Sequence, residues 1–348
     1  MAKFLHIADL HLGYRQYGMP QREEDVYLAL LEVEKLALEQ VADVVIAGDL
    51  FDTPKPPARA VLELKKFVSH LESNGLRVMA IEGNHDATKD NYWLEVCGIR
   101  HLDSEVPAKI GECLVKGINF DSSEKVLAKI DEMVANEEQC DILVMHAGFV
   151  EMQGDYASEF STEELSQKLK LLDCKYVANG HIHMWAQVES NGVTFCQPGS
   201  LEIKSINEPH RKQAALVEIA GNKVKVTQLV YPVRKVFVKQ IDTEEELQKV
   251  LGSLSSYSNH LSVLYINRTL ENAVELLTKE FSKYPGAMYR IVPVGEVNDF
   301  DRTTAFNNLG DAIEEYFGKD TPEYTLISRC LQTPENAANI ARGFIDGQ

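Results

Sequence analysis

Apolar and polar residues alternate along the first half of the chain with two different periods. Short apolar runs that end in glycine or polar residues predict strands, and longer segments with apolar residues at helical spacing predict helices between them. The helical segments include EEDVYLALLEVEKLALEQV (23–41) and RAVLELKKFVSHLESNG (59–75). Strands that alternate with helices are typical of an α/β domain. KFLHIAD (3–9) is a predicted strand, and a strand followed by a loop is predicted for DVVIAGDLFD (43–52), LRVMAIEGNHD (76–86), DILVMHAGF (141–149) and KYVANGHIH (175–183).

The pattern changes twice in the second half of the chain. Residues 187–230 are rich in strand-forming residues, and the stretches SNG and AGNK within them predict hairpin turns. After Pro232, a strand–helix–strand–helix–strand pattern continues to residue 294, and helical segments follow. We therefore predict three parts: a main domain of residues 1–232, a small α+β domain of residues 233–298, and a helical segment of residues 303–348.

Two short helices are predicted at the C-terminal end. Each starts with Thr-Pro-Glu, at Thr321 and Thr333, where threonine can cap the helix and proline fits its first position. Helices this short are marginal in water by themselves. We therefore expect them to fold against the body of the chain or against the apolar face of a partner helix pair, with a solvated extension as the plain alternative.

Composition and charge narrow the class of protein. The 348 residues are 45% hydrophobic and 25% charged, which is ordinary for a globular protein. We expect a cytoplasmic protein, because the sequence shows neither an apolar run of membrane-spanning length nor a secretory pattern at its start. Six cysteines without a C-x-x-C pair argue against a zinc ribbon or a disulfide scaffold. A net charge of −18 excludes a generally basic surface, so a polyanionic substrate would need a local attraction such as bound divalent cations.

Residues that can bind metals follow each of the five predicted strands. The carboxyl ends of strands in an α/β sheet are where sites assemble, so these side chains are expected to meet. Each motif has a plain explanation when taken alone, because Asn, Asp and Gly favour turns and a lone histidine is usually a core or surface residue. Five of the ten histidines nevertheless fall at these ends. The motifs are Asp9-x-His11, Gly48-Asp49-x-x-Asp52, Gly83-Asn84-His85-Asp86, His146 and Gly180-His181-x-His183.

The ligand types indicate the kind of metal. Imidazoles, carboxylates and one amide, without a thiolate, suit Mn, Fe or Zn better than Ca and disfavour a structural zinc site. The motifs can supply seven such ligands, which are identified below, and seven are too many for one ion. They suit two ions about 3.5–4 Å apart that share one carboxylate. Two dications beside two aspartates would retain positive charge, which suits an anionic phosphodiester.

In this order, the five motifs resemble those of the calcineurin-like metallophosphoesterase superfamily. More narrowly, AGDLFDTPKPP, AIEGNHDAT and GHIHMWAQV resemble the SbcD-type (Mre-eleven-like) DNA double-strand-break repair nucleases, and the likeness extends through QPGSLE (197–202). The resemblance implies a four-layer α/β/β/α sandwich with a small α+β capping domain, whose plainer alternative is a dimerisation or stability module. It also implies metal ligands, namely Asp9, His11 and His183 for one ion, Asn84, His146 and His181 for the other, and Asp49 as the bridge.

Two further positions carry implied roles. His85 would orient the scissile phosphate or protonate the leaving oxygen. Alternatively, His85 would only form a hydrogen bond to a metal ligand. Many relatives have a histidine where this chain has Asp52. An aspartate cannot donate a proton at neutral pH unless its pKa is raised, so we expect Asp52 to orient a ligand rather than to guide the substrate.

The resemblance implies a Mn-dependent DNA nuclease with 3′-to-5′ exonuclease and single-strand endonuclease activities, which processes double-strand-break ends by two-metal phosphodiester hydrolysis. It implies two Mn²⁺ ions per subunit, with Mg, Fe and Zn as open alternatives. It also implies a nucleoid-associated homodimer formed through helices early in the main domain, such as residues 23–38, which could equally be ordinary core. An SbcC-type coiled-coil ABC ATPase bound by residues 303–348 is implied as well. The rivals are a small-molecule phosphodiesterase or phosphatase on the same fold and a non-catalytic DNA-binding scaffold, against which the complete ligand set argues.

Overall fold

The structure is a computed structural model that describes residues 1–88, 92–153 and 159–294. The predicted helical segment 303–348 lies outside the described residues. None of the helices in the described ranges combines the length and the apolar composition that a membrane span requires.

Two six-stranded sheets form the main part of the described chain, with the orders β12-β11-β1-β2-β3-β4 and β5-β6-β7-β8-β10-β9. The central strands β1 to β4 of the first sheet are parallel, as are β6, β7, β8 and β10 of the second. The first sheet consists of β1 (Ala2–Ile7), β2 (Asp43–Ala47), β3 (Val78–Ile81), β4 (Arg100–His101), β11 (Lys212–Ala220) and β12 (Lys223–Tyr231). The second consists of β5 (Ala108–Ile110), β6 (Cys113–Gly117), β7 (Ile142–His146), β8 (Tyr176–Gly180), β9 (Ala186–Ser190) and β10 (Val193–Gln197).

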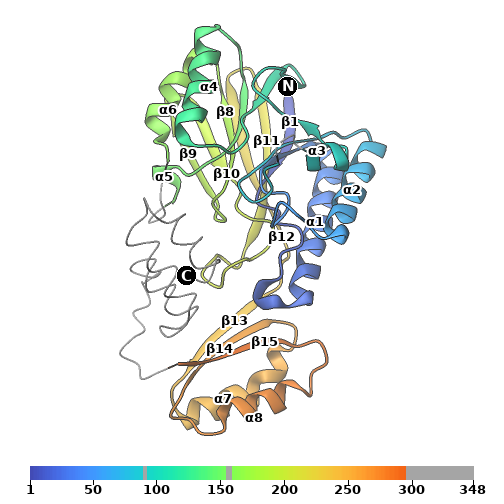
Figure 1. The fold of residues 1–348 in the computed structure, drawn as a ribbon, viewed down its shortest axis with the longest axis vertical. Coiled ribbons are helices and arrows are strands. Elements are labelled where there is room, and N and C mark those ends of the chain that lie inside the picture. Colours follow the sequence, from blue (N-terminus) through green and yellow to red (C-terminus); the bar gives the residue numbers. More distant parts are fainter. Residues whose placement is uncertain (89–91, 154–158, 295–348) are drawn as a thin grey trace, which may run out of the picture. The chain divides into compact units, whose positions relative to one another are not determined.

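Helices cover the outer face of each sheet (Figure 1). Alternate residues of a strand point to opposite faces, and β2 shows what each face contacts. Val44 and Ile46 belong to one apolar cluster with residues of α1 and α2, whereas Val45 and Ala47 belong to a second cluster with residues of β7 and β8. A third cluster joins β7 and β8 to α4 and α6. The helices are α1 (Pro20–Gln40), α2 (Ala58–Ser73), α3 (Tyr92–Cys97), α4 (Ser123–Ala135), α5 (Val150–Gln153) and α6 (Thr162–Leu169), with short 3-10 turns at Gln16–Gly18 and Lys170–Leu172.

The order helix, sheet, sheet, helix confirms the predicted four-layer α/β/β/α sandwich. Both predicted hairpin turns are also present, since β9 and β10 join through Asn191 and Gly192, and β11 and β12 through Gly221 and Asn222. The short strands β4, β5 and β6 and the helices α3 to α6 were not predicted. β4 has two residues and β5 three, which is too short to show a hydrophobic period.

The predicted strand–helix–strand–helix–strand pattern after Pro232 forms a three-stranded sheet of order β13-β14-β15. Thr243 caps the first helix of this sheet, because its side chain accepts a hydrogen bond from the backbone N–H of Glu246. The elements are β13 (Val236–Ile241), α7 (Glu244–Ser253), a 3-10 turn (Leu254–Tyr257), β14 (Leu261–Asn267), α8 (Ala273–Phe281) and β15 (Met288–Val294). The elements agree with the pattern, and the assignment of residues 233–298 as a separate domain stays a prediction.

Residues from β13, β14 and β15 pack on the loops that surround the candidate site. Val236, Val263 and Met288 share an apolar cluster with Ile203, and Tyr17 packs against it. An ion pair adds to this contact, because the guanidinium of Arg234 donates from Nε and Nη2 to the carboxylate of Asp25 on α1, each at 2.7 Å. Met1–Tyr265 and Asn272–Val292 accordingly belong to one compact unit.

A buried histidine in β1 predicts acid sensitivity of the fold. His6 is fully buried, with Nδ1 2.9 Å from the hydroxyl of Tyr176, and burial lowers the pKa of His6 from 6.5 to about 3. Between these two pH values the unfolded chain binds a proton that the folded chain does not. The free energy of unfolding therefore falls as the pH falls through this window, by at most about 1.4 kcal/mol per pH unit from this residue.

We expect His6→Phe to have a shallower fall of the unfolding free energy between pH 6.5 and pH 4 than the unmodified chain. Urea denaturation at several pH values measures the two slopes. Equal slopes in the two proteins would show that His6 does not titrate in this way.

Candidate metal centre

The residues that follow five parallel strands come together at one edge of the two sheets. Asp9 and Asp49 each lie two residues beyond the ends of β1 and β2, and Asn84 lies three beyond β3. From the second sheet, His146 ends β7 and His181 follows β8. Because parallel strands present their carboxyl ends at the same edge, residues distant in the sequence become neighbours.

Two glycines allow the two sheets to approach closely at this edge. A Cβ on Gly48 would lie 2.4 Å from Nδ1 of His146, and a Cβ on Gly180 would lie 2.1 Å from the carbonyl oxygen of Ala47. That same carbonyl accepts a hydrogen bond of 2.8 Å from Nδ1 of His146. Glycine at these positions therefore leaves room for the contact that orients His146.

The first group of candidate ligands consists of Asp9, His11 and His183. Each offers one ligand atom, and these atoms lie within 4.8 Å of one another. Nε2 of His11 and Nε2 of His183 are only 3.2 Å apart, so the two rings face the same point. Asp9 and His11 are buried, and His183 is half-buried.

Asp49 lies between this group and a second one. Its Oδ2 atom is 3.4 Å from Nε2 of His11 and 3.5 Å from Nε2 of His146. The amide oxygen of Asn84 in turn lies 3.0 Å from Nε2 of His146 and 3.2 Å from Nδ1 of His181. The structure thus brings all seven predicted ligands together, in two groups with one carboxylate between them.

The electrostatics of these groups fit divalent cations. Burial lowers the pKa of His11 to about 3 and that of His181 to about 4, so both rings are neutral at neutral pH, as ligation requires. Burial opposes ionisation of Asp49, but His146 and His11 hold the pKa of this carboxyl below its ordinary value. Burial lowers the pKa of His146, but Asp49 and Asp9 outweigh this and raise it to about 9, which marks the second group as a place for positive charge.

Four of the seven residues adopt a backbone conformation that side chains rarely favour. The φ angles are +53° at Asp9, +44° at His11, +52° at Asp49 and +91° at His181. Left-handed backbone at non-glycine residues persists only where the surrounding structure holds it, and it is concentrated at functional sites. The positive φ angles therefore agree with a functional site, where the direction of the ligand side chains is maintained at the cost of an unfavourable backbone conformation.

His85 and Asp52 lie beside the first group, and together with its member His11 they offer a further set of ligand atoms within 4.8 Å of one another. His85 is exposed, its ring centroid is 4.6 Å from that of His11, and its Nδ1 atom is 2.9 Å from the carbonyl oxygen of Asp52. The carboxylate of Asp52 lies 3.3 Å from Nδ1 of His11 and 3.0 Å from Nζ of Lys204. Burial opposes ionisation of Asp52, but His11 and Lys204 lower its pKa to about 2, so this side chain accepts rather than donates protons.

Asp86 is a site residue to which the sequence pointed without giving a role. It is buried, and its carboxylate accepts hydrogen bonds from the backbone N–H groups of Leu50 and Phe51, at 2.5 and 3.1 Å, and of Gly83, at 2.9 Å. One side chain therefore joins the loop that carries Asp49 to the loop that carries Asn84 and His85.

We expect Asp86→Ala to lower the free energy of unfolding by on the order of 3 kcal/mol, because three backbone donors lose their acceptor in a buried place. Urea denaturation of the metal-free protein measures this. Asp103→Ala is the matched control, since Asp103 accepts backbone hydrogen bonds from Glu105 and Val106 in an exposed turn. Similar losses in both variants would contradict a special role of Asp86.

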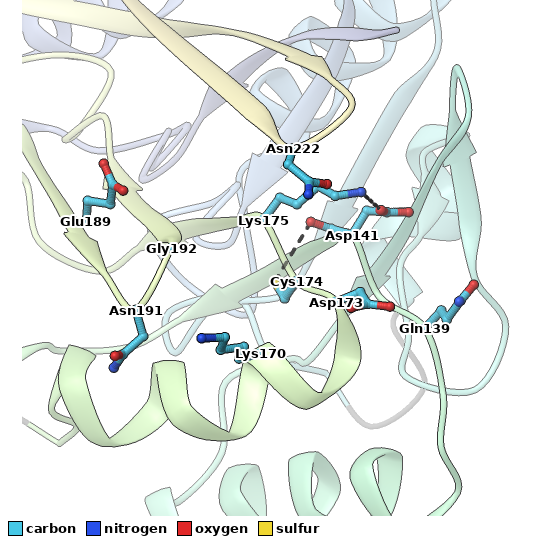
Figure 2. Close-up of a pocket in the computed structure, with 10 residues that line it drawn as sticks. All are labelled: Gln139, Asp141, Lys170, Asp173, Cys174, Lys175, Glu189, Asn191, Gly192 and Asn222. Atoms are coloured by element: carbon cyan, nitrogen blue, oxygen red, sulfur yellow. Dashed lines mark hydrogen bonds and ion pairs between the residues drawn. The ribbon is translucent and has the colours of Figure 1, made fainter.

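Two hollows of the structure differ in whether the candidate ligands line them. A cavity of about 290 Å³ adjoins the centre, because His181 and His183 line it together with Ile182, Met184 and Glu208. A polar hollow of about 630 Å³ contains none of the seven ligands, and within it Lys175 pairs with Asp141 while Cys174 contacts the carbonyl of Asp141 (Figure 2). Of these two hollows, the first adjoins the candidate ligands and has room for a group bound at them.

Known proteins resemble this chain in sequence. It is 32% identical over 233 residues to the DNA double-strand break repair protein Mre11 of Archaeoglobus fulgidus, a match that covers 59% of this chain and 51% of that protein. The Mre11 protein of Methanosarcina mazei is 25% identical (81% and 47% covered), and that of Sulfolobus acidocaldarius is 26% identical (90% and 90%). The chain thus spans about half the length of the first two relatives.

A sequence model of one protein family matches more than half of the chain. The family is described as calcineurin-like phosphoesterase, and the match covers residues 2–185. All seven candidate ligands, from Asp9 to His183, lie within this range. The matched region therefore contains the five strands and all seven candidate ligands. This chain belongs to the calcineurin-like phosphoesterase family.

Proposed function

We propose that this chain is a metal-dependent DNA nuclease that acts at double-strand-break ends, with Mn²⁺ as the cation and with 3′-to-5′ exonuclease and single-strand endonuclease activities. The observation that carries the proposal is the arrangement of seven candidate ligands in two groups, with Asp49 3.4 and 3.5 Å from one imidazole of each group. Similarity to Mre11 proteins supports DNA as the substrate.

The chain's own residues have distinct tasks in this proposal. Asp9, His11 and His183 would hold one cation, Asn84, His146 and His181 the other, and Asp49 both. Two such cations, when bound, generate a nucleophile from water and stabilise the charge on the phosphate. His85, whose exposed ring lies 4.6 Å from that of His11 between centroids, would orient the phosphate or donate a proton to the leaving oxygen.

The surroundings of the centre support a DNA strand as its ligand. The chain is strongly acidic overall, so the cation pair would be the local attraction for a polyanion. The cavity lined by His181 and His183 leaves room beside the scissile phosphate. We also propose that residues 233–298 cap the site and limit the access of duplex DNA, which is supported by the packing of Val236, Val263 and Met288 on Ile203.

A nuclease assay tests the proposal. Labelled duplex, hairpin and single-stranded DNA are incubated with the chain, with and without Mn²⁺, and with EDTA. We expect cleavage that requires the metal and starts at 3′ ends or in single strands. Release of nitrophenol from bis(p-nitrophenyl) phosphate without cleavage of any DNA would favour a small-molecule phosphodiesterase, and inactivity on both would favour a DNA-binding scaffold.

We further propose that the chain forms a homodimer through α1. Leu28 and Leu31 lie three residues apart on this helix, each 49% exposed, and they line a groove together with Lys66 and Phe67 of α2. Large apolar side chains exposed side by side favour association with a second copy of the chain. Sedimentation velocity tests this proposal, and a monomer at micromolar concentration would contradict it.

Residues 303–348, outside the described residues, are proposed to bind the coiled-coil base of an SbcC-type ATPase. The short helices that the sequence predicts after each Thr-Pro-Glu would need another surface to fold on, which supports this proposal. Truncation before Thr303 should leave Mn-dependent cleavage unchanged and abolish capture of the ATPase in a pull-down. Thermal melting of the truncated chain is the control for folding. Normal capture of the ATPase, or loss of the folded state, would contradict the proposal.

A further inference from the structure

A buried ion pair lies directly behind one of the candidate ligands and has no part in the function proposed above. Nζ of Lys212 donates to Oε2 of Glu208 at 2.6 Å, and both side chains are buried, with Lys212 only 1% exposed. A buried ion pair is often no more stabilising than apolar residues of the same size. Its position, rather than its contribution to stability, is therefore the feature to explain.

The pair holds His183 by its side chain and by its backbone. Oε1 of Glu208 lies 3.3 Å from Nδ1 of His183, the ring nitrogen that does not face the centre. The other ring nitrogen, Nε2, is the one that lies 3.2 Å from Nε2 of His11. Lys212 also donates to the carbonyl oxygen of His183 at 3.0 Å. Contacts to the ring and to the backbone thus both fix His183, with Nε2 directed at the candidate cation site.

Glu208 also organises the loop that supports His11. Its carboxylate accepts hydrogen bonds from the backbone N–H groups of Ser205, at 3.0 Å, and Lys204, at 3.3 Å. Nζ of Lys204 is 3.0 Å from the carboxylate of Asp52, which lies 3.3 Å from Nδ1 of His11. One buried carboxylate therefore contacts His183 directly and reaches His11 through Lys204 and Asp52.

The second group of ligands has a different support. Nδ1 of His146 donates to the backbone carbonyl of Ala47, and Asn84 lies on the loop that Asp86 holds. None of the hydrogen bonds described for these residues involves Glu208 or Lys212. His146 and the Asn84 loop are therefore oriented without Glu208 and Lys212, whereas His181 is joined to the first group, because its backbone N–H donates to the carboxylate of Asp9 at 3.0 and 3.2 Å.

We propose that Glu208, held in place by Lys212, is the positioning residue for the cation of Asp9, His11 and His183, and that the cation of Asn84, His146 and His181 does not depend on it. The inference rests on the proposed function only in taking these residues as metal ligands. Partners that orient a ligating imidazole typically change metal affinity 10–100-fold when they are replaced. Glu208→Gln should therefore weaken one cation by about that factor and leave the other unchanged.

The experiment is a titration of metal-free full-length chain with Mn²⁺, followed by calorimetry and by elemental analysis after buffer exchange. The unmodified chain should retain two ions and Glu208→Gln one. Glu218→Gln is the matched control, because Glu218 pairs with Lys225 at 2.9 Å on the hairpin of β11 and β12, away from the centre. This control should retain both ions.

Two further variants separate positioning from folding. Glu208→Gln combined with Lys212→Met removes both charges, so no unpaired buried charge remains, and it should also retain one ion while the metal-free protein melts as a folded chain. Adding Glu208→Gln to His183→Ala should cause a much smaller loss of affinity than Glu208→Gln causes in the unmodified chain, because Glu208 contacts His183 directly and reaches His11 only through Lys204 and Asp52.

Two results would overturn the inference: equal weakening of both ions, or two ions bound at normal affinity in Glu208→Gln. Because the readout is bound metal, failure of DNA cleavage in the unmodified chain would count against the proposed function alone.

Discussion

Asp49→Ala is expected to release both cations together. Oδ2 of Asp49 lies 3.4 Å from Nε2 of His11 and 3.5 Å from Nε2 of His146, so its removal takes one ligand from each group. It also leaves the buried His146 without the carboxylate that raises its pKa to about 9. Because replacing a partner of a ligand already costs 10–100-fold, the loss of a shared ligand should lower both affinities by more than about a hundredfold.

Elemental analysis and Mn²⁺ titration of Asp49→Ala measure this loss. Asp43→Ala is the control, because Asp43 starts the same strand β2 at the opposite end, where its carboxylate accepts a hydrogen bond from the backbone of Arg77 at 2.8 Å. The control should bind both ions normally. One ion at full occupancy in Asp49→Ala would show that Asp49 does not bridge.

His85→Ser should retain both cations and lose cleavage by about 10²–10⁴-fold, the range that a general acid contributes. The side chain of His85 is exposed and lies beside the ring of His11, at 4.6 Å between centroids, outside the seven ligands. The backbone N–H of His85 donates to Oδ1 of Asp49 at 2.9 Å, and serine preserves this contact. The metal centre should therefore stay intact while proton transfer is lost.

Single-turnover cleavage of labelled DNA measures the effect of His85→Ser, and elemental analysis measures the bound metal in the same samples. His70→Ser is the control, because His70 is an exposed histidine of α2 that pairs with Glu34. It should cleave DNA at the normal rate. Loss of metal from His85→Ser would instead assign His85 a structural role.

The main elements of the sandwich could be predicted from local patterns. The helix predicted for residues 23–41 is α1 (Pro20–Gln40), which begins earlier because proline fits the first turn. The helix predicted for residues 59–75 is α2 (Ala58–Ser73). These segments are long enough for a helical period to be visible, whereas β4 has two residues and β5 three.

The members of the candidate centre could also be proposed from the sequence, for a reason of topology. Each follows an apolar strand, and parallel strands present their carboxyl ends at one edge. Order along the chain was therefore enough to expect that Asp9, Asp49 and His146 lie together, and in the structure they do. Their roles as ligands remain a proposal that the metal titrations test.

The amino-acid sequence by itself determined the five strands that lead to the site, the helices α1 and α2 and the residues at the strand ends, because these depend on local periodicity and on chain order. Only the tertiary structure decided which polar groups support them. Asp86 lies 36 residues from Leu50, and Glu208 lies 25 residues from His183. In the sequence, nothing distinguishes Glu208 and Lys212 from charged residues that are exposed to solvent. Burial against two loops is what turns them into fixed partners of a ligand, and burial is a property of the folded chain.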